Sequence, residues 1–271
     1  MKKVSMTIAT MLVTGVGFGQ TATAVTNVSD FGMAGWESTD TRVEGANATT
    51  QAQIDSRIQF VQGPAGADGG ALNLIAPATS DKATLALVDT NGLGGLAGLT
   101  AEYRWYKDSP SGAAAPGFKI GLQTADFGTT GSSSRIGEND WDKVLIYEPY
   151  DNPSGGNPPT GQWITQTLDA ETGTWWMFDR TTLTTVNAPH NSLTLAEWMD
   201  DEEWGTLLTG ATIVDIQLGV GSGNADVDSY VDYLSVSFDG GVMSTTYNFI
   251  PEPTSLTLLG IGGMMMLRRR R

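Results

Sequence analysis

An aspartate-rich segment near the end of the chain has the residue types and spacing of a metal site. Asp226 and Asp228 are two residues apart, so their side chains point to the same side of an extended chain. Asp232 alternates in step with the apolar residues that follow it, and a carboxylate that faces a core needs a partner. Carboxylates and backbone carbonyls are the ligands of Ca²⁺. These three residues and Asp30 are therefore candidates for a structural Ca²⁺ site; the alternative, which we favour, is that they cap turns and bond backbone N–H groups.

Tryptophan side chains are the second group with a chemical use, because their flat faces can stack on sugar rings. Trp105, Trp163, Trp175 and Trp176 all lie in segments that alternate between polar and apolar residues. Adjacent residues of a strand face opposite ways, so we expect one of Trp175 and Trp176 in the core and the other at the surface. The four residues are candidates for a glycan platform; the alternative is core or edge packing.

Residues for catalysis are sparse. His190 is the single histidine, and it follows a proline in a polar loop, which gives no support for a Ser-His-Asp triad. The acidic run 200–203 is expected to be the solvated end of a helix. A retaining glycosidase needs two carboxylates about 5–5.5 Å apart, and no strand here carries the Glu-x-Asp-x-Glu type of motif found in concanavalin-like glycosidases. We expect no catalytic residues and no enzyme; a glycoside hydrolase or lyase is the less favoured alternative.

The N-terminus has the three parts of a secretory signal. Lys2 and Lys3 provide positive charge, and an uncharged, mostly apolar stretch follows at 8–18. Ala22 and Ala24 place small residues at the −3 and −1 positions of a cleavage site. We expect export and cleavage after Ala24.

The C-terminus carries a second targeting pattern. Pro251, Glu252 and Pro253 precede an uncharged stretch at 254–267, and the chain closes with four arginines: Arg268, Arg269, Arg270 and Arg271. A helix over the uncharged stretch would span about 21 Å, short of the roughly 30 Å hydrocarbon core, and arginine side chains that reach to the interface supply part of the difference. We expect a transmembrane-type helix with its arginines on the cytoplasmic side.

This tail closely resembles the PEP-CTERM sorting signal, with all of its three parts present in order. The resemblance covers about the last 22 residues of the sequence. It implies processing by an exosortase, a membrane protease, near the Pro-Glu-Pro motif. It also implies an inner-membrane-anchored precursor whose product reaches the cell surface or the extracellular matrix. The bodies of such proteins vary widely, so the tail assigns no chemistry to residues 25–250.

Composition narrows the partners of the body. The 271 residues include no cysteine, which excludes disulfides and thiolate metal sites, and the net charge is −15. Without the two N-terminal lysines and the four C-terminal arginines, 9 basic residues face 30 acidic ones, or about −21. Such a charge disfavours nucleic acid and anionic lipid, and suits divalent cations or neutral polymers.

Alternation of polar and apolar residues predicts an all-β fold. Eleven strands are expected, at 57–61, 71–76, 83–88, 100–107, 118–123, 143–147, 162–168, 174–178, 211–220, 230–238 and 243–249. One short helix is expected at 195–203, with a capping box of Thr194 and Glu197. The pattern favours a two-sheet antiparallel sandwich, a concanavalin-like jelly roll. The strand at 230–238 resembles the last strand of jelly-roll carbohydrate modules, where an aspartate joins a structural Ca²⁺ site.

These features predict three regions: a signal peptide at 1–24, a β-sandwich domain at 25–249 and the sorting tail at 250–271. The function expected is that of an exported, exosortase-processed protein of the cell surface or matrix. Its sandwich would be a non-catalytic module that associates with extracellular polysaccharide. The alternatives are a purely structural, self-associating envelope protein and, less favoured, a polysaccharide-active hydrolase.

Overall fold

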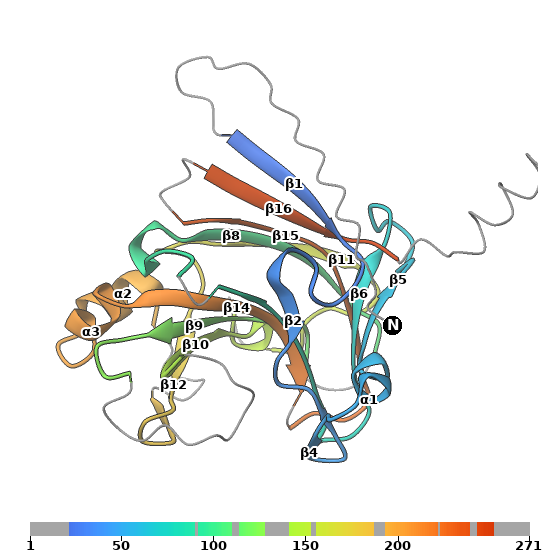
Figure 1. Cartoon of the computed structure of the whole chain (residues 1–271), viewed down its shortest axis with the longest axis horizontal. Coiled ribbons are helices and arrows are strands. Elements are labelled where there is room, and N and C mark those ends of the chain that lie inside the picture. The colour runs from blue at the N-terminus through green and yellow to red at the C-terminus, as the bar shows by residue number, and fades with distance from the viewer. Residues whose placement is uncertain are drawn as a thin grey trace, which may run out of the picture.

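The computed structural model describes residues 22–89, 92–109, 114–127, 141–152, 156–186, 193–221, 223–238 and 243–251. These residues form two β-sheets, A and B, packed face to face as a sandwich (Figure 1). Short helices and 3-10 turns lie around the two sheets: α1 (Gln51–Asp55), α2 (Leu195–Asp200), α3 (Gly205–Thr209), η1 (Met33–Gly35), η2 (Leu96–Gly98) and η3 (Pro149–Asp151).

Sheet A is organised around the long strand β15 (Val227–Ser237). One edge of β15 pairs with β8 (Thr100–Lys107), which pairs in turn with β11 (Trp163–Leu168). The other edge pairs first with β6 (Ala71–Ala76) and then with β16 (Met243–Phe249). Beyond these lie β5 (Ile58–Val61) and β1 (Ala22–Val28). The β1–β16 pair is parallel, whereas the other pairs are antiparallel.

Sheet B is antiparallel, and its strands come from all parts of the sequence. Its order is β13 (Thr184–Val186), β12 (Trp175–Asp179), β10 (Lys143–Tyr147), β9 (Gly117–Gln123), β14 (Thr212–Gly221) and β7 (Lys82–Val88). Both β2 (Trp36–Ser38) and β3 (Arg42–Val43) pair with β7, and β4 (Ala46–Asn47) pairs with β3. Figure 1 shows the strands of this sheet bending away from sheet A, so the outer face of sheet B is concave.

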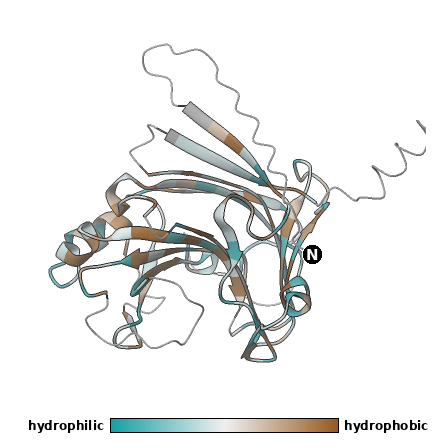
Figure 2. Ribbon diagram, in the orientation of Figure 1, coloured by the Kyte–Doolittle hydropathy of each residue, from teal (hydrophilic) through white to brown (hydrophobic). Residues whose placement is uncertain are grey.

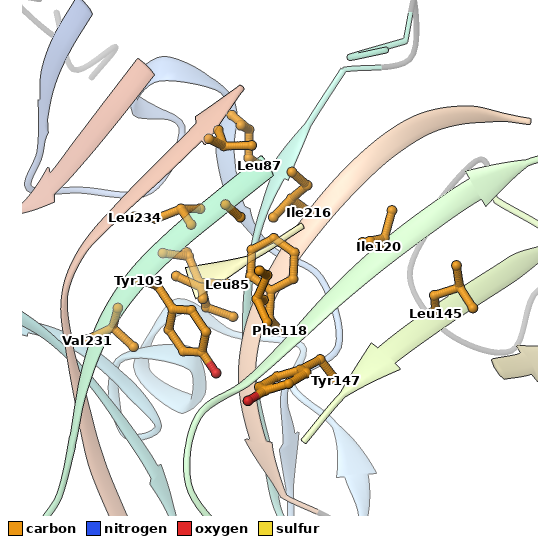
Figure 3. Close-up of a cluster of buried hydrophobic side chains, with 14 of the residues drawn as sticks. Leu85, Leu87, Tyr103, Phe118, Ile120, Leu145, Tyr147, Ile216, Val231 and Leu234 are labelled. Atoms are coloured by element: carbon orange, nitrogen blue, oxygen red, sulfur yellow. The ribbon is translucent and has the colours of Figure 1, made fainter. Parts of the chain in front are cut away.

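The core lies between the two sheets, because alternate residues of each strand point inward. Sheet B contributes side chains such as Phe118 and Ile216, and sheet A contributes Tyr103 and Leu234, all of them fully buried (Figure 3). Burial of each such large apolar side chain stabilises the fold by about 1.5–3 kcal/mol. Hydrophobic residues run along much of β14, one of the central strands of sheet B (Figure 2).

The predicted sandwich is confirmed, and each of the eleven predicted strands overlaps an observed one. The sequence pattern missed β1, β2, β3, β4 and β13. Four of these strands, β2, β3, β4 and β13, have only two or three residues, which is too short for alternation to be visible. The observed strand β1 has no charged residue and pairs in parallel with β16, a contact between chain ends that no local pattern indicates.

The helix predicted at 195–203 is shorter than expected. Its start is confirmed, since Thr194 Oγ1 accepts a hydrogen bond from the Glu197 N–H at 3.2 Å and the Thr194 N–H donates to Glu197 Oε2 at 2.8 Å. It ends at Asp200 because Asp201 has extended backbone angles. The Asp201 carboxylate then accepts bonds from the N–H groups of Glu203 and Trp204, both at 2.9 Å, and turns the chain into α3.

The two targeting segments lie almost entirely outside the described residues. Strand β1 begins at Ala22, so cleavage after Ala24 would leave the part of β1 from Val25 to Val28 in the sheet. Pro251 is described, whereas Glu252, Pro253, the predicted tail helix and the four arginines are not. Within the described part of the chain, no helix is long and apolar enough to cross a membrane.

Candidate functional site: the concave face of sheet B

The four predicted platform tryptophans divide between the core and the surface. Trp105 and Trp175 have exposed fractions of 2% and 0%, so the expectation that they stack on glycans is wrong. Both face inward in strands whose burial alternates, as the core requires. Trp176, the neighbour of Trp175, points outward from sheet B and is partly exposed. The predicted division between these two neighbours is therefore confirmed.

Trp163 is also partly exposed, but it lies on the outer face of sheet A and supports a loop there. Its indole Nε1 donates a hydrogen bond to the Ala65 carbonyl at 3.1 Å. The guanidinium of Arg104 lies 5.0 Å from the centroid of its ring, in a cation–π contact. Arg104 Nη1 donates to the Gly66 carbonyl of the same loop at 2.9 Å. One face and the Nε1 edge of this indole thus contribute to holding loop 62–70.

The prediction that Asp232 faces the core is wrong. Its carboxylate instead has partners within the protein. Its carboxylate accepts a bond from Arg104 Nη1 at 2.7 Å and another from the Asp68 N–H at 2.9 Å. The prediction assumed unbroken alternation along the strand. The pairing of β15 with β8 shifts between Val231 and Tyr233, and this β-bulge changes the facing of the residue between them.

The other three aspartates of the predicted calcium site have separate surroundings. Asp228 Oδ1 accepts from Asn73 Nδ2 at 2.6 Å, and Asp30 Oδ1 accepts from the Phe31 N–H at 2.8 Å. Asp226 occupies a turn with a φ of 57°, and its N–H donates to the Pro77 carbonyl at 3.1 Å. No group of three or more metal-ligating side chains was found among the described residues. Calcium binding stays a prediction of the sequence. His190 lies outside the described residues.

The concave face of sheet B brings together the side chains best suited to bind a ligand, and the sequence did not single out this surface. We use this name for the outward residues of β12, β10, β9, β14 and β7. Strand register aligns one row of them across the sheet, which consists of Trp176, Ile146, Lys119, Gln217 and Ala86. Four steps between neighbouring strands make this row about 19 Å long. The next row consists of Phe178, Val144, Gly121, Asp215 and Val88.

Glycines leave the centre of this face without side chains. Gly117 and Gly219 are paired across β9 and β14, and Gly121 is paired with Asp215. A Cβ on Gly219 would lie 2.9 Å from Thr84 Oγ1 and 3.5 Å from Lys119 Nζ. A glycine inside a strand often marks a place where a ligand or another backbone approaches closely. The polar side chains beside these glycines therefore lie close to the backbone of the sheet.

Asp215 is a buried carboxyl group in the middle of the face. A bulge in β14 between Ile213 and Asp215 turns both Val214 and Asp215 outward. Gln217 Nε2 donates to both carboxyl oxygens of Asp215, at 3.1 and 3.2 Å. Burial raises the pKa of Asp215 to about 7, although the bonds from Gln217 and from the Gly121 N–H, and the charge of Lys119, act in the opposite direction.

Lys119 is the basic group at the centre of the face, and its side chain is only partly exposed. Burial and the nearby charge of Lys82 lower the pKa of Lys119 to about 7, although Asp40, Glu148 and Asp215 favour its charged form. Burial alone would raise the pKa of Asp40, but Lys82, Lys119 and Arg42 hold it below the usual value. The centre of the face thus holds one acid, Asp215, and one base, Lys119, whose pKa values are both about 7.

An apolar patch adjoins these polar groups on the side of β10 and β12. Trp141, Val144, Ile146 and Val214 are buried there, with Trp176 and Phe178 packed against them. Trp176 Nε1 donates to Glu148 Oε2 at 3.3 Å, which fixes the orientation of the indole. The concave face therefore has an aromatic and aliphatic half beside a half that carries hydrogen-bonding groups.

The sequence contained one signal for this face. Asp215, Gln217 and Gly219 recur at every second position of a strand whose other residues are large and apolar, as expected of a strand with one polar face. The partners Lys119 and Gly121 lie about a hundred residues earlier in the sequence. Only the pairing of β9 with β14 shows that they complete the same surface.

No protein-family model and no curated protein matches this chain. Among solved structures, it is similar to a glycosyl hydrolase family 16 protein from Mycobacterium smegmatis, with 20% identity, a TM-score of 0.37 and coverage of 77% of this chain and 94% of that one. It is also similar to the cellulose induced protein Cip1, with 13% identity, a TM-score of 0.36 and coverage of 66% of this chain and 84% of that one. A third similar structure is SGBP-B of a Bacteroides uniformis xyloglucan utilization locus, with 14% identity and a TM-score of 0.28. The match covers 68% of this chain and 48% of SGBP-B, so this chain spans about half of the length of SGBP-B. Likenesses this weak add nothing to the functional argument.

Proposed function

We propose that this chain is an exported, exosortase-processed protein of the cell surface or extracellular matrix, and that its sandwich is a non-catalytic jelly-roll module that binds extracellular polysaccharide on the concave face of sheet B. The single observation that carries the binding site is the row across this face. It places the partly exposed Trp176 about two strand spacings, or roughly 10 Å, from the partly exposed Lys119, and about three spacings, or roughly 14 Å, from Gln217.

The chemistry of this face suits a sugar chain. Sugar rings have apolar C–H faces that pack on an indole and hydroxyl edges that need hydrogen-bond partners. Binding sites in general combine an apolar lining with a few placed polar groups. Trp176 supplies the indole, and Lys119 and Glu148 supply a donor and an acceptor. Trp176 and Lys119 are the partly exposed members of this row, and the roughly 10 Å between them gives space for linked rings.

A binding role is favoured over catalysis by the state of Asp215. Its exposed fraction is 1%, and both of its oxygens accept bonds from Gln217. A catalytic acid must reach the proton that it transfers, and this carboxyl group lies below the surface that a ligand would touch. We infer that Asp215 positions Gln217.

The proposed site is tested with Trp176→Ala and a panel of soluble polysaccharides, by affinity electrophoresis of the purified protein. We expect loss of stacking to weaken binding by about tenfold or more, since an aromatic contact contributes about 0.5–1.5 kcal/mol beyond its buried area. Trp163→Ala is the matched control, because Trp163 is also partly exposed and donates one hydrogen bond, but on the opposite face of the sandwich. Binding that is lost in Trp163→Ala and retained in Trp176→Ala would refute the placement.

The export proposal rests on the two ends of the sequence and needs its own test. Mass spectrometry of the protein recovered from the producing cells is expected to show an N-terminus at Val25 and a C-terminus near Pro251. Retention of either segment in the mature protein would contradict this part of the proposal.

A further inference from the structure

Carboxylates outnumber basic residues two to one in this chain, 30 to 15, so a cation has many possible partners. In the described part of the chain, five basic side chains form ion pairs with aspartates: Arg42 and Lys82 with Asp40, Arg57 with Asp81, Arg104 with Asp232, and Lys143 with Asp142 and Asp179. Arg180 donates to the Trp141 carbonyl, and Lys107 also has a partner. Among the described residues, Lys119 alone of the basic side chains has neither a hydrogen bond nor an ion pair.

The three carboxylates whose charges act on Lys119 already accept hydrogen bonds from other groups. Asp40 accepts a hydrogen bond from Lys82 and forms an ion pair with Arg42, Asp215 accepts from Gln217, and Glu148 accepts from Trp176. Their charges act on Lys119 without a direct bond. The ammonium of Lys119 thus has these three carboxylates and the ammonium of Lys82 in its surroundings, and it still lacks an acceptor oxygen.

The position of Lys119 makes this unused donor accessible to a ligand. It lies in the middle of the row, between Ile146 and Gln217 on the neighbouring strands. The Lys119 side chain is partly exposed, and Gly219 on the adjacent strand adds no side chain beside it. Desolvation makes an unbonded polar group costly, so a ligand that brings acceptors to this point gains free energy.

We propose that Lys119 is the central hydrogen-bond donor of the site and that it selects neutral polysaccharides, by donating to hydroxyl or ring oxygens, over chains that carry uronate or sulfate groups. This inference rests on the proposed function and names the class of its ligand. An acidic sugar would bring its charge close to Asp40, Glu148 and Asp215, in a protein whose chain without its terminal basic clusters carries about −21. Like charges at such sites oppose binding. A neutral sugar meets donors and acceptors without this repulsion.

The experiment is a binding titration of the purified protein with neutral chains (laminarin, xyloglucan, galactomannan) and acidic chains (alginate, polygalacturonate, heparin), at low and high salt. Lys119→Met removes the donor at nearly constant volume, and Lys119→Arg restores one. A bond to a charged donor contributes about 1.5–3 kcal/mol, so we expect Lys119→Met to weaken binding of neutral chains by about tenfold or more. Lys119→Arg should recover most of this affinity, with little dependence on salt. Thermal melting of each variant checks that the fold is retained.

Several outcomes would overturn the inference, and they are distinguishable from failure of the proposed function. Tighter binding of acidic chains that weakens with salt would refute the selectivity, while sensitivity to Trp176→Ala would still support a glycan site on this face. Unchanged binding of neutral chains by Lys119→Met would refute the role of the ammonium. If no chain in either group binds the native protein, the proposed function fails, and the ligand class inferred here fails with it.

Discussion

Replacement of Gly121 with alanine would put a methyl group where the carboxyl group of Asp215 lies. An ideal Cβ on Gly121 would be 2.0 Å from Asp215 Oδ1, 2.6 Å from Asp215 Cγ and 2.9 Å from Trp141 Cδ1. These distances are too short for unbonded atoms, so Asp215 must rotate away and give up its bonds from Gln217. Overpacking costs about 1–3 kcal/mol, and a buried polar group that loses its partners costs about 1–3 kcal/mol more. We expect Gly121→Ala to lower the free energy of unfolding by about 2–5 kcal/mol and to abolish glycan binding.

Urea denaturation measures the effect, with Gly95→Ala as the matched control. Gly95 has a φ of −102°, and nothing lies within 4 Å of its ideal Cβ, so we expect a change within about 0.5 kcal/mol. Asp215→Ala in the Gly121→Ala background removes the carboxyl half of the clash, and the double mutant should therefore be less destabilised than the sum of the two single changes. Equal stability of Gly121→Ala and Gly95→Ala would refute the packing described for the concave face.

Two further predictions concern the titration of Asp215 and the ion pair of Arg104 with Asp232 on sheet A. Burial raises the pKa of Asp215 from 3.8 to about 7, so the folded state holds a proton that the unfolded state releases. The stability contribution of Asp215 is therefore greatest below about pH 4 and is lost as the pH rises to 7. Asp215→Asn should flatten this part of the curve of urea midpoint against pH, and parallel curves for the two proteins would contradict the raised pKa. Arg104→Ala should lower the free energy of unfolding by about 3 kcal/mol, because it leaves the buried carboxylate of Asp232 without its cation. A loss in urea denaturation below about 1 kcal/mol, as for an exposed ion pair, would show that this pair does not hold loop 62–70.

The sequence by itself determined the strands and the class of fold. Alternation over five or more residues identified the strands that make up most of both sheets, since a strand with one buried face must place apolar residues at every second position. It also predicted that Trp175 and Trp176 face opposite ways. The cap formed by Thr194 and Glu197 was visible because it depends on two residues only three positions apart.

Local patterns failed where the backbone departs from regular alternation. Asp232 was expected to face inward because the apolar residues after it do so. The bulge beside Val231 interrupts the alternation, and the partner Arg104 comes from a strand more than a hundred residues earlier. Neither the bulge nor the cross-strand pair is encoded in the spacing of aspartates, so the spacing made Asp232 a candidate metal ligand where the fold supplies the guanidinium of Arg104.

The concave face was decided by tertiary structure alone. Lys119 and Gly121 lie on β9, Asp215 and Gln217 lie on β14, and Trp176 lies on β12. Each residue is unremarkable in its own segment: a lysine, a glycine or an amide on the polar side of a strand. Their chemistry comes from proximity, because burial together brings the pKa of both Asp215 and Lys119 to about 7, although the attraction between their charges opposes both shifts. Alternation predicts on which side of its strand each of these residues lies. Which strands become neighbours depends on packing of the whole chain, and this neighbourhood creates the candidate site.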